Sequence, residues 1–356
     1  MIGADHRRRR PLAVSMVDPA GIGPEITLRA WLERSDKGLE PFVVFADKSA
    51  IAERARTLGI TVPIVPVATP AEALDVFGTA LPVLHAPLAI RADAGNPDTA
   101  NAPAIIAAIE AATAAVVHGE ASAIVTNPIA KHVLRSADFP FPGHTEFLAA
   151  LAERHTGKPA RPVMMLASHE LRVVPLTVHC ALAEVSKAIT RALIFETVRT
   201  TYAALRRDFG ISAPRIAVAG LNPHAGEEGT MGREEVDTIA PAIADLRAEG
   251  LSVTGPHSAD TLFHAAARRG YDTVIAMYHD QALIPLKTIG FDEGVNVTLG
   301  LPFVRTSPDH GTAFDIAGTG KASPSSLVAA LQLAARLAAE DEKRRAAAPA
   351  KPAFAG

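Results

Sequence analysis

The sequence predicts an α/β protein whose sheet is mixed and largely parallel. Short segments of β-branched and other apolar residues alternate along the chain with longer helical patterns. Turns rich in glycine and proline separate the two kinds of segment, as at 18–24 and 139–143. The chain shows no internal repeat. Alternation of this kind is typical of parallel strands joined by crossover helices.

The composition is that of an ordinary globular chain. Its 356 residues, 48% hydrophobic and 21% charged, suffice for two to three domains or one large two-lobed unit. The net charge of −3 gives no electrostatic case for nucleic acid. No window approaches an uninterrupted apolar span of about 18 residues, and residues 1–14 lack the apolar core of a secretory signal. We expect no membrane anchor.

Cys180 is the single cysteine of the sequence. An intrachain disulfide and a multi-cysteine zinc site are therefore both excluded, which fits a reducing cytoplasm. A metal would have to be held by histidine nitrogen and carboxylate oxygen.

The expected elements follow in chain order. After a leader at 1–10 that we expect to be disordered, strands are predicted at 11–17, 42–46, 61–67, 82–85, 123–125, 163–166, 173–178, 216–221 and 273–278. Helices are predicted at 25–33, 102–118, 184–209, 234–249 and 323–345, and the Ala- and Pro-rich end at 346–356 is expected to be disordered.

Two turns between these elements are candidates for ligand contact. The segment 18–25 runs from a strand through two glycines into a helix whose first turn holds Pro24, which suits an anion- or substrate-facing loop or a plain β–α turn. It matches neither a dinucleotide fingerprint nor a P-loop. In the second turn, His144 and Thr145 open a helix with Glu146 in its first turn, although Thr145 could serve only as its cap.

Three predicted strands end in histidine, at His179, His224 and His279, with 45 and 55 residues between them. Because parallel strands end at one edge of a sheet, these residues can converge on a metal that acts as a Lewis acid. With 13 histidines in the chain, a hydrogen-bonded structural role is the alternative. Asp260 or Asp280 could add a carboxylate or orient an imidazole.

Lys287, Asn296 and Arg305 follow the third of these strands, which we expect to lead into a loop at His279. The Lys287 ammonium, the Asn296 amide and the planar Arg305 guanidinium suit carboxylate or phosphate oxygens, although a cation in a loop is often only solvated. A metal beside an anion site fits hydride removal from an alcohol, or metal-assisted aldol or hydrolytic chemistry.

Seven collinear motifs over about residues 11 to 340 resemble the 4-hydroxythreonine-4-phosphate dehydrogenase family of the pyridoxal phosphate pathway. They are VDPAGIGPE, TNPIAK, FPGHTEFL, GLNPHAGEEGTMGREE, GPHSADTLF, AMYHDQALIPLK and GVNVTLGLPFVRTSPDHGTAFDIAGTGKA. Two positions depart from the family pattern, Val17 before the first turn and Ala130 in the second motif.

The resemblance implies a cytoplasmic, homodimeric oxidoreductase that uses NAD or NADP and a divalent metal (zinc, magnesium or cobalt). It implies the two-lobed isocitrate and isopropylmalate dehydrogenase type of fold, with the active site in a cleft at the dimer interface. Residues 11–340 would form one catalytic unit of two interleaved lobes, about 11–125 with 280–340, and about 126–279.

The match also implies the site residues. His179, His224 and His279 would be metal ligands contributed across the interface, with Asp260 near the metal. The substrate contacts would be His144, Thr145, Lys287, Asn296 and Arg305. The turn 310–318 resembles an adenosine-side cofactor loop, so the cofactor contacts would be Asn222, His310, Gly311, Thr312 and Asp315. The general base is left open among His144, Lys287 and a water on the metal, and Asp260 is the third catalytic candidate.

The implied reaction oxidises 4-hydroxy-L-threonine 4-phosphate to 2-amino-3-oxo-4-phosphooxybutanoate, which loses carbon dioxide to give 3-amino-2-oxopropyl phosphate. A related branch of the family oxidises D-erythronate or D-threonate 4-phosphate in sugar-acid catabolism. A more distant branch acts on aromatic dihydrodiols, and His144, Thr145 and Arg305 argue against it. The rivals from other classes are a metal-dependent lyase or aldolase without nicotinamide, and a binding protein descended from the enzyme.

Overall fold

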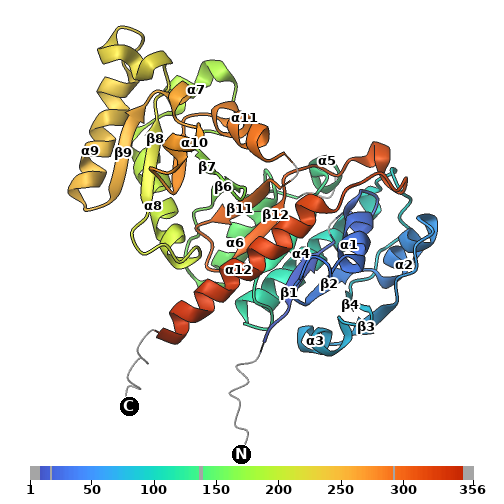
Figure 1. Ribbon diagram of the computed structural model, residues 1–356. Coiled ribbons are helices and arrows are strands. Elements are labelled where there is room, and N and C mark those ends of the chain that lie inside the picture. Colours follow the sequence, from blue (N-terminus) through green and yellow to red (C-terminus); the bar gives the residue numbers. More distant parts are fainter. Residues whose placement is uncertain (1–8, 17, 136–138, 292, 348–356) are drawn as a thin grey trace, which may run out of the picture. The chain divides into compact units, whose positions relative to one another are not determined.

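The computed structural model describes residues 9–347, apart from 17, 136–138 and 292 (Figure 1). The expected leader and tail therefore lie largely outside the described residues, and so does the departure at Val17. The described chain divides into two compact units. Unit 1 comprises residues up to 170 together with 286–335, and unit 2 comprises 171–285 together with the chain from 336 onward. This division places 126–170 with the N-terminal unit, whereas the sequence-based lobes placed them in the second.

Unit 1 is built on a mixed sheet whose strands follow the order β3-β4-β2-β1-β5-β12-β11-β6. Only β11 runs antiparallel to its neighbours in this set, so the sheet is mixed and largely parallel, as the sequence predicts. The strands are β1 (Leu12–Ser15), β2 (Phe42–Ala46), β3 (Ile64–Val67), β4 (Leu81–His85), β5 (Ile124–Thr126), β6 (Val163–Ala167), β11 (Val295–Leu299) and β12 (Arg305–Pro308).

The helices of unit 1 begin at sequence signals that are easily recognised. Pro24 occupies the first turn of α1, and the Asp47 carboxylate caps α2 by accepting from the backbone N–H of Ser49 (2.7 Å) and Ala50 (3.0 Å). These helices are α1 (Gly23–Leu32), α2 (Lys48–Thr57), α3 (Ala73–Val76), α4 (Ala102–Val117), α5 (Lys131–Arg135), α6 (His144–Thr156) and the part of α12 (Ser325–Ala347) up to residue 335.

Helix α4 forms the centre of the unit 1 core, against β1, β2 and α6 (Figure 1). The stretch Thr99–Val117 has the length and mean hydropathy, 1.6, of a membrane-spanning helix, but half of it is buried inside the protein. Its alanines, such as Ala108 and Ala112, let the helix approach the sheet closely, and Ile109 is fully buried. Its apolar character is therefore that of a core helix.

Unit 2 holds a smaller parallel sheet in the order β7-β10-β8-β9. Its strands are β7 (Arg172–Pro175), β8 (Arg215–Ala219), β9 (Ser252–His257) and β10 (Thr273–Ala276). Its helices are α7 (Leu182–Ala188), α8 (Arg191–Arg207), α9 (Ala240–Ala248), α10 (Ala265–Arg268) and α11 (His279–Ile289), the last of which continues into unit 1.

Two predictions for unit 2 are wrong. The single helix expected at 184–209 is two helices, because Ile189 is extended and the Thr190 hydroxyl caps α8 by accepting from Leu193 N–H at 3.2 Å. The loop expected at His279 is instead the first turn of α11, which follows β10 after two residues.

Replacing Leu148 by alanine should lower the free energy of unfolding by about 2–5 kcal/mol, because the side chain is fully buried in the unit 1 core and its loss leaves a cavity. Urea denaturation followed by circular dichroism measures the change. Glu153→Ala, on the exposed side of the same helix, should stay within about 0.5 kcal/mol of the parent chain. Equal losses in the two variants would contradict the assignment of Leu148 to the core.

Candidate active site

The site residues expected from the sequence fall into two groups, each within one unit. The anion-binding group and the turn 310–318 belong to unit 1. The three candidate metal ligands, His179, His224 and His279, belong to unit 2 together with Asp260 and Asn222.

His144 is the first residue of α6 and is almost fully buried. Gly143 occupies the N-cap position without a side-chain cap, so Thr145 is not the cap of this helix. Burial, followed by the nearby Arg305 charge, holds the pKa of His144 well below its usual value, which leaves the imidazole neutral. Its Nε2 is buried without a hydrogen-bond partner in the described part of the chain, so it can contact a ligand.

Arg305 is a buried cation at the start of β12, with 4% of its surface exposed. Its guanidinium donates from Nε (3.2 Å) and Nη2 (2.7 Å) to the Thr126 hydroxyl, and from Nη1 (2.8 Å) to the Thr298 hydroxyl. Burial lowers its pKa to about 10, and Glu146 opposes that shift. Within the described residues the guanidinium makes no ion pair, so no carboxylate partner neutralises its positive charge and a bound anion can do so.

Asn296 and Lys287 complete this group in unit 1. Asn296 and Thr298 are alternate residues of β11, so their side chains lie on the same face as the Arg305 guanidinium. The buried Oδ1 of Asn296 has no partner among the described residues. The Lys287 ammonium lies 3.1 Å from a carboxylate oxygen of Asp309, a residue that the sequence analysis did not single out.

Within unit 2, three parallel strands end at the same edge of the sheet. The register pairs Ala276 of β10 with Pro175 of β7, and Ile275 of β10 with Val218 of β8. The expectation that the histidines sit at the strand ends needs correction, because each lies several residues beyond its strand. His179 follows β7, His224 follows β8 in the turn Pro223–Gly229, and His279 opens α11.

His179 and His279 are brought together, with 6.0 Å between their ring centroids. The Asp280 carboxylate lies 2.7 Å from Nδ1 of His279, as proposed for an orienting acid. Since a carboxylate only accepts, Nδ1 is the donor in this bond, and in the neutral imidazole Nε2 then presents its lone pair.

His224 is exposed and lies near Asp260. The pKa of Asp260 is lowered chiefly by the hydrogen bond from Ser258 (2.5 Å), with a smaller contribution from His224. Among the described residues, no group of three or more histidine, cysteine, aspartate or glutamate side chains is arranged to hold a metal in a single chain. The convergence of all three histidines remains a prediction.

The turn 310–318 is fastened to the turn that precedes α1. The Thr312 carbonyl accepts from Ile22 N–H at 3.0 Å, and the Glu25 carboxylate accepts from the backbone N–H of Gly318 (3.0 Å) and Ala322 (3.3 Å). Glu25 is fully buried. An acid in the first turn of an otherwise apolar helix was the only sequence signal for this role.

Other residues that support the site were missed. Arg54 is buried and donates to the carbonyls of Gly21 (2.7 Å) and Pro19 (3.1 Å), which fixes the turn before α1. Thr126 and Thr298 hold Arg305 but look like ordinary strand residues. Asn222, expected at the cofactor, lies in unit 2 and donates its amide to Glu234 (2.7 Å) and Glu235 (2.9 Å).

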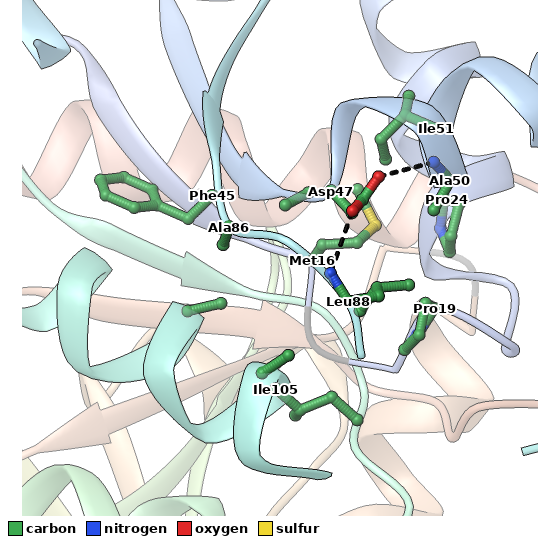
Figure 2. Close-up of a pocket in the computed structure, with 13 residues that line it drawn as sticks. Met16, Pro19, Pro24, Phe45, Asp47, Ala50, Ile51, Ala86, Leu88 and Ile105 are labelled. Atoms are coloured by element: carbon green, nitrogen blue, oxygen red, sulfur yellow. Dashed lines mark hydrogen bonds between the residues drawn. The ribbon is translucent and has the colours of Figure 1, made fainter. Parts of the chain in front are cut away.

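A hollow of about 320 Å³, open to solvent, lies beside the turn before α1 (Figure 2). Met16, Phe45 and Ile105 make its wall apolar, and the Asp47 carboxylate at its rim is bound to the backbone of Ala50 and Leu88. None of the expected site residues lines it. We therefore do not assign it to the reaction.

Comparisons with known proteins agree on one family. The family model described as "Pyridoxal phosphate biosynthetic protein PdxA" matches residues 38–334. The chain belongs to the PdxA family. A PdxA relative from Methylorubrum populi, named 4-hydroxythreonine-4-phosphate dehydrogenase, is 57% identical over 331 residues, which cover 92% of this chain and 95% of the relative.

Solved structures give the same grouping. The 4-hydroxythreonine-4-phosphate dehydrogenase of Klebsiella pneumoniae superposes with a TM-score of 0.83 at 38% identity, covering 93% of this chain and 98% of that one. The terephthalate 1,2-cis-dihydrodiol dehydrogenase of Burkholderia xenovorans gives a TM-score of 0.61 at 28% identity, covering 92% and 98%. The fold is therefore that of the PdxA family.

The buried neutral His144 should make folding less favourable in acid. Because its folded-state pKa is depressed, the unfolded chain binds the proton more readily, so its contribution is complete above pH 6.5 and is lost as pH falls below that value. His144→Gln removes this titration. Urea denaturation from pH 8 to pH 5 should show the parent losing up to about 1.4 kcal/mol per pH unit more than the variant. Parallel pH profiles would show that the histidine is not held neutral.

Proposed function

We propose that this member of the PdxA family is an NAD(P)-dependent, divalent-metal-dependent dehydrogenase. Its substrate would be 4-hydroxy-L-threonine 4-phosphate, oxidised to 2-amino-3-oxo-4-phosphooxybutanoate and decarboxylated to 3-amino-2-oxopropyl phosphate. The observation that carries the proposal is the buried Arg305, which makes no ion pair with any described residue, beside neutral His144 in a chain 57% identical to a relative named for this activity.

The phosphate would bind to the group in unit 1. Arg305 is already held by two hydroxyls, so it can donate to an anion without reorganising. A phosphate there would offset part of the cost of burying the guanidinium, which is several kcal/mol for an isolated ion. Asn296, Thr145 and Lys287 supply further donors, and the Nε2 of His144 faces the same ligand.

The metal would be held by His179, His224 and His279. The donor set fits a divalent transition metal, because two imidazoles already lie together and a carboxylate orients one of them. When bound, such a metal polarises the substrate hydroxyl and the developing carbonyl oxygen. Asp260, His144 and Lys287 are the side chains proposed for proton transfer. His144 is neutral through burial, and its Nε2 has no partner among the described residues.

The nicotinamide cofactor would lie along the turn 310–318. At Gly311 an added Cβ would meet nothing within 4 Å, so the backbone is open to a ligand. Glu25 fixes the far end of the turn, which would hold His310, Thr312 and Asp315 in place. The Asn222 amide already donates to Glu234 and Glu235 within unit 2, so we propose a smaller role for it in cofactor binding than the resemblance implies.

We propose that two copies of the chain assemble into a homodimer and that each contributes ligands to a shared metal site. Large apolar side chains are exposed in unit 2 close in sequence to each of the three histidines. They are Val178, Leu182, Met231, Val236 and Ile284. Burying them in a second copy would favour association by about 25 cal/mol per Å² of apolar surface. We place the enzyme in the cytoplasm, where the exposed thiol of Cys180 would stay reduced.

The first test is formation of NADH or NADPH by the metal-loaded protein. 4-Hydroxy-L-threonine 4-phosphate should be preferred over D-erythronate and D-threonate 4-phosphates, and His224→Ala should abolish the reaction. Preference for a sugar acid would move the chain to the catabolic branch of the family. Turnover without any reduction of NAD or NADP would favour a lyase.

Arg305→Lys should raise KM for the phosphorylated substrate at least about tenfold, because an ammonium cannot hold Thr126, Thr298 and a phosphate together. Steady-state kinetics measures the change. Arg154→Lys, an exposed arginine paired with Glu110, is the matched control and should leave KM unchanged. An unchanged KM in Arg305→Lys would remove the buried arginine from the substrate site.

A further inference from the structure

The turn that carries His224 has an unusual backbone. Six successive residues of Pro223–Gly229 have positive φ, namely His224 (52°), Ala225 (53°), Gly226 (78°), Glu227 (40°), Glu228 (56°) and Gly229 (94°). Only two of them, Gly226 and Gly229, are glycine. Each of the other four costs about 1–2 kcal/mol in this conformation. Such a turn persists only where its surroundings hold it.

The buried Glu235 side chain stabilises this turn. Its carboxylate is 3% exposed, and Oε1 accepts from the backbone N–H of Leu221 (2.7 Å) and Asn222 (2.8 Å). Oε2 accepts from the Asn222 amide at 2.9 Å. Bonds to an ionised acceptor are about twice as strong as neutral ones. The entry to the turn is therefore fixed from one buried group.

The same carboxylate also touches the middle of the turn. A Cβ added at Gly226 would lie 2.6 Å from Oε2, and one added at Gly220 would lie 3.1 Å from Oε1. Only glycine permits so close an approach at Gly226. His224 lies between the two places where Glu235 contacts the chain, so the direction of its side chain depends on them.

The neighbouring Glu234 provides a contrast. It accepts from the Asn222 amide (2.7 Å) and from the Ser186 hydroxyl (2.6 Å), but from no backbone N–H of the turn. It is also only half-buried. Two adjacent acids of the same size therefore contact the same asparagine, and only one of them supports the backbone of the turn.

We propose that Glu235 is a positioning residue for His224. The Glu235 carboxylate fixes the left-handed turn so that the His224 imidazole can bind the metal. This inference rests on the proposed function, which makes His224 a metal ligand. Glu235 itself contacts neither metal nor substrate. It acts by reducing the conformational freedom of the ligand that does.

The test uses full-length protein, with Co²⁺ as the probe. Glu235→Gln keeps the size of the side chain but removes its charge and replaces Oε2 by an NH2 group, which cannot accept from the Asn222 amide. Its Co²⁺ affinity, measured by calorimetry, should fall about 10- to 100-fold. The visible absorption of bound Co²⁺, which reports ligand geometry, should change as well. Glu234→Gln should bind Co²⁺ with the parent's affinity and spectrum.

A rescue separates positioning from general stability. Ala225→Gly lowers the cost of positive φ and should restore part of the lost Co²⁺ affinity when combined with Glu235→Gln. If Glu235→Gln does not fold, Gly226→Ala, which forces the carboxylate aside, should give the same loss of affinity.

Two results would overturn the inference. They are a parental affinity and spectrum in Glu235→Gln, and an equal loss in Glu234→Gln. His224→Ala keeps this failure distinct from failure of the proposed function. If His224→Ala binds Co²⁺ like the parent, the metal role of the histidine is wrong. If it loses Co²⁺ while Glu235→Gln does not, only the positioning role is wrong.

Discussion

The buried guanidinium of Arg305 is the constraint on which the site in unit 1 depends. It bridges β5 and β11 from the start of β12 through two threonine hydroxyls, so it joins the strands where the antiparallel part of the sheet meets the parallel part. A charge in such a place is expensive unless it is compensated. The two hydroxyls accept hydrogen bonds from the guanidinium but do not neutralise its charge. A bound anion can supply the opposite charge.

Each unit uses one buried glutamate in a comparable way. Glu25 accepts from the backbone beyond the turn 310–318 in unit 1, and Glu235 accepts from the backbone at the entry to the His224 turn in unit 2. Both acids accept hydrogen bonds from main-chain N–H groups, and Glu25 also lies 3.8 Å from the Arg29 guanidinium. The irregular segments that carry the candidate ligands are thus held by side chains that take no part in the chemistry.

The sequence predicted most elements because their signals are local. The start of α6 after two prolines and Gly143 and the apolar strands of both sheets could be identified from turn chemistry and β propensity. The break at Thr190 could not, because a threonine inside a helical pattern looks the same whether it caps or continues the helix. The three histidines and the group of Lys287, Asn296 and Arg305 stood out at predicted strand ends and by their chemistry, but their assigned roles and the cofactor contacts came from the resemblance. Contacts such as that between His179 and His279 join residues far apart in sequence, so local patterns do not reveal them.

The left-handed turn could not be predicted from sequence patterns, since four of its six residues with positive φ are of types that usually avoid that region. It also changes which substitutions this segment can accept. Asparagine, aspartate and glycine tolerate the left-handed region, so they can replace Ala225, Glu227 or Glu228 at little conformational cost. Valine, isoleucine and threonine, which elsewhere pass as mild exchanges for alanine, are sterically the worst choices here. Variation among natural relatives at these three positions should therefore follow backbone geometry more closely than side-chain polarity.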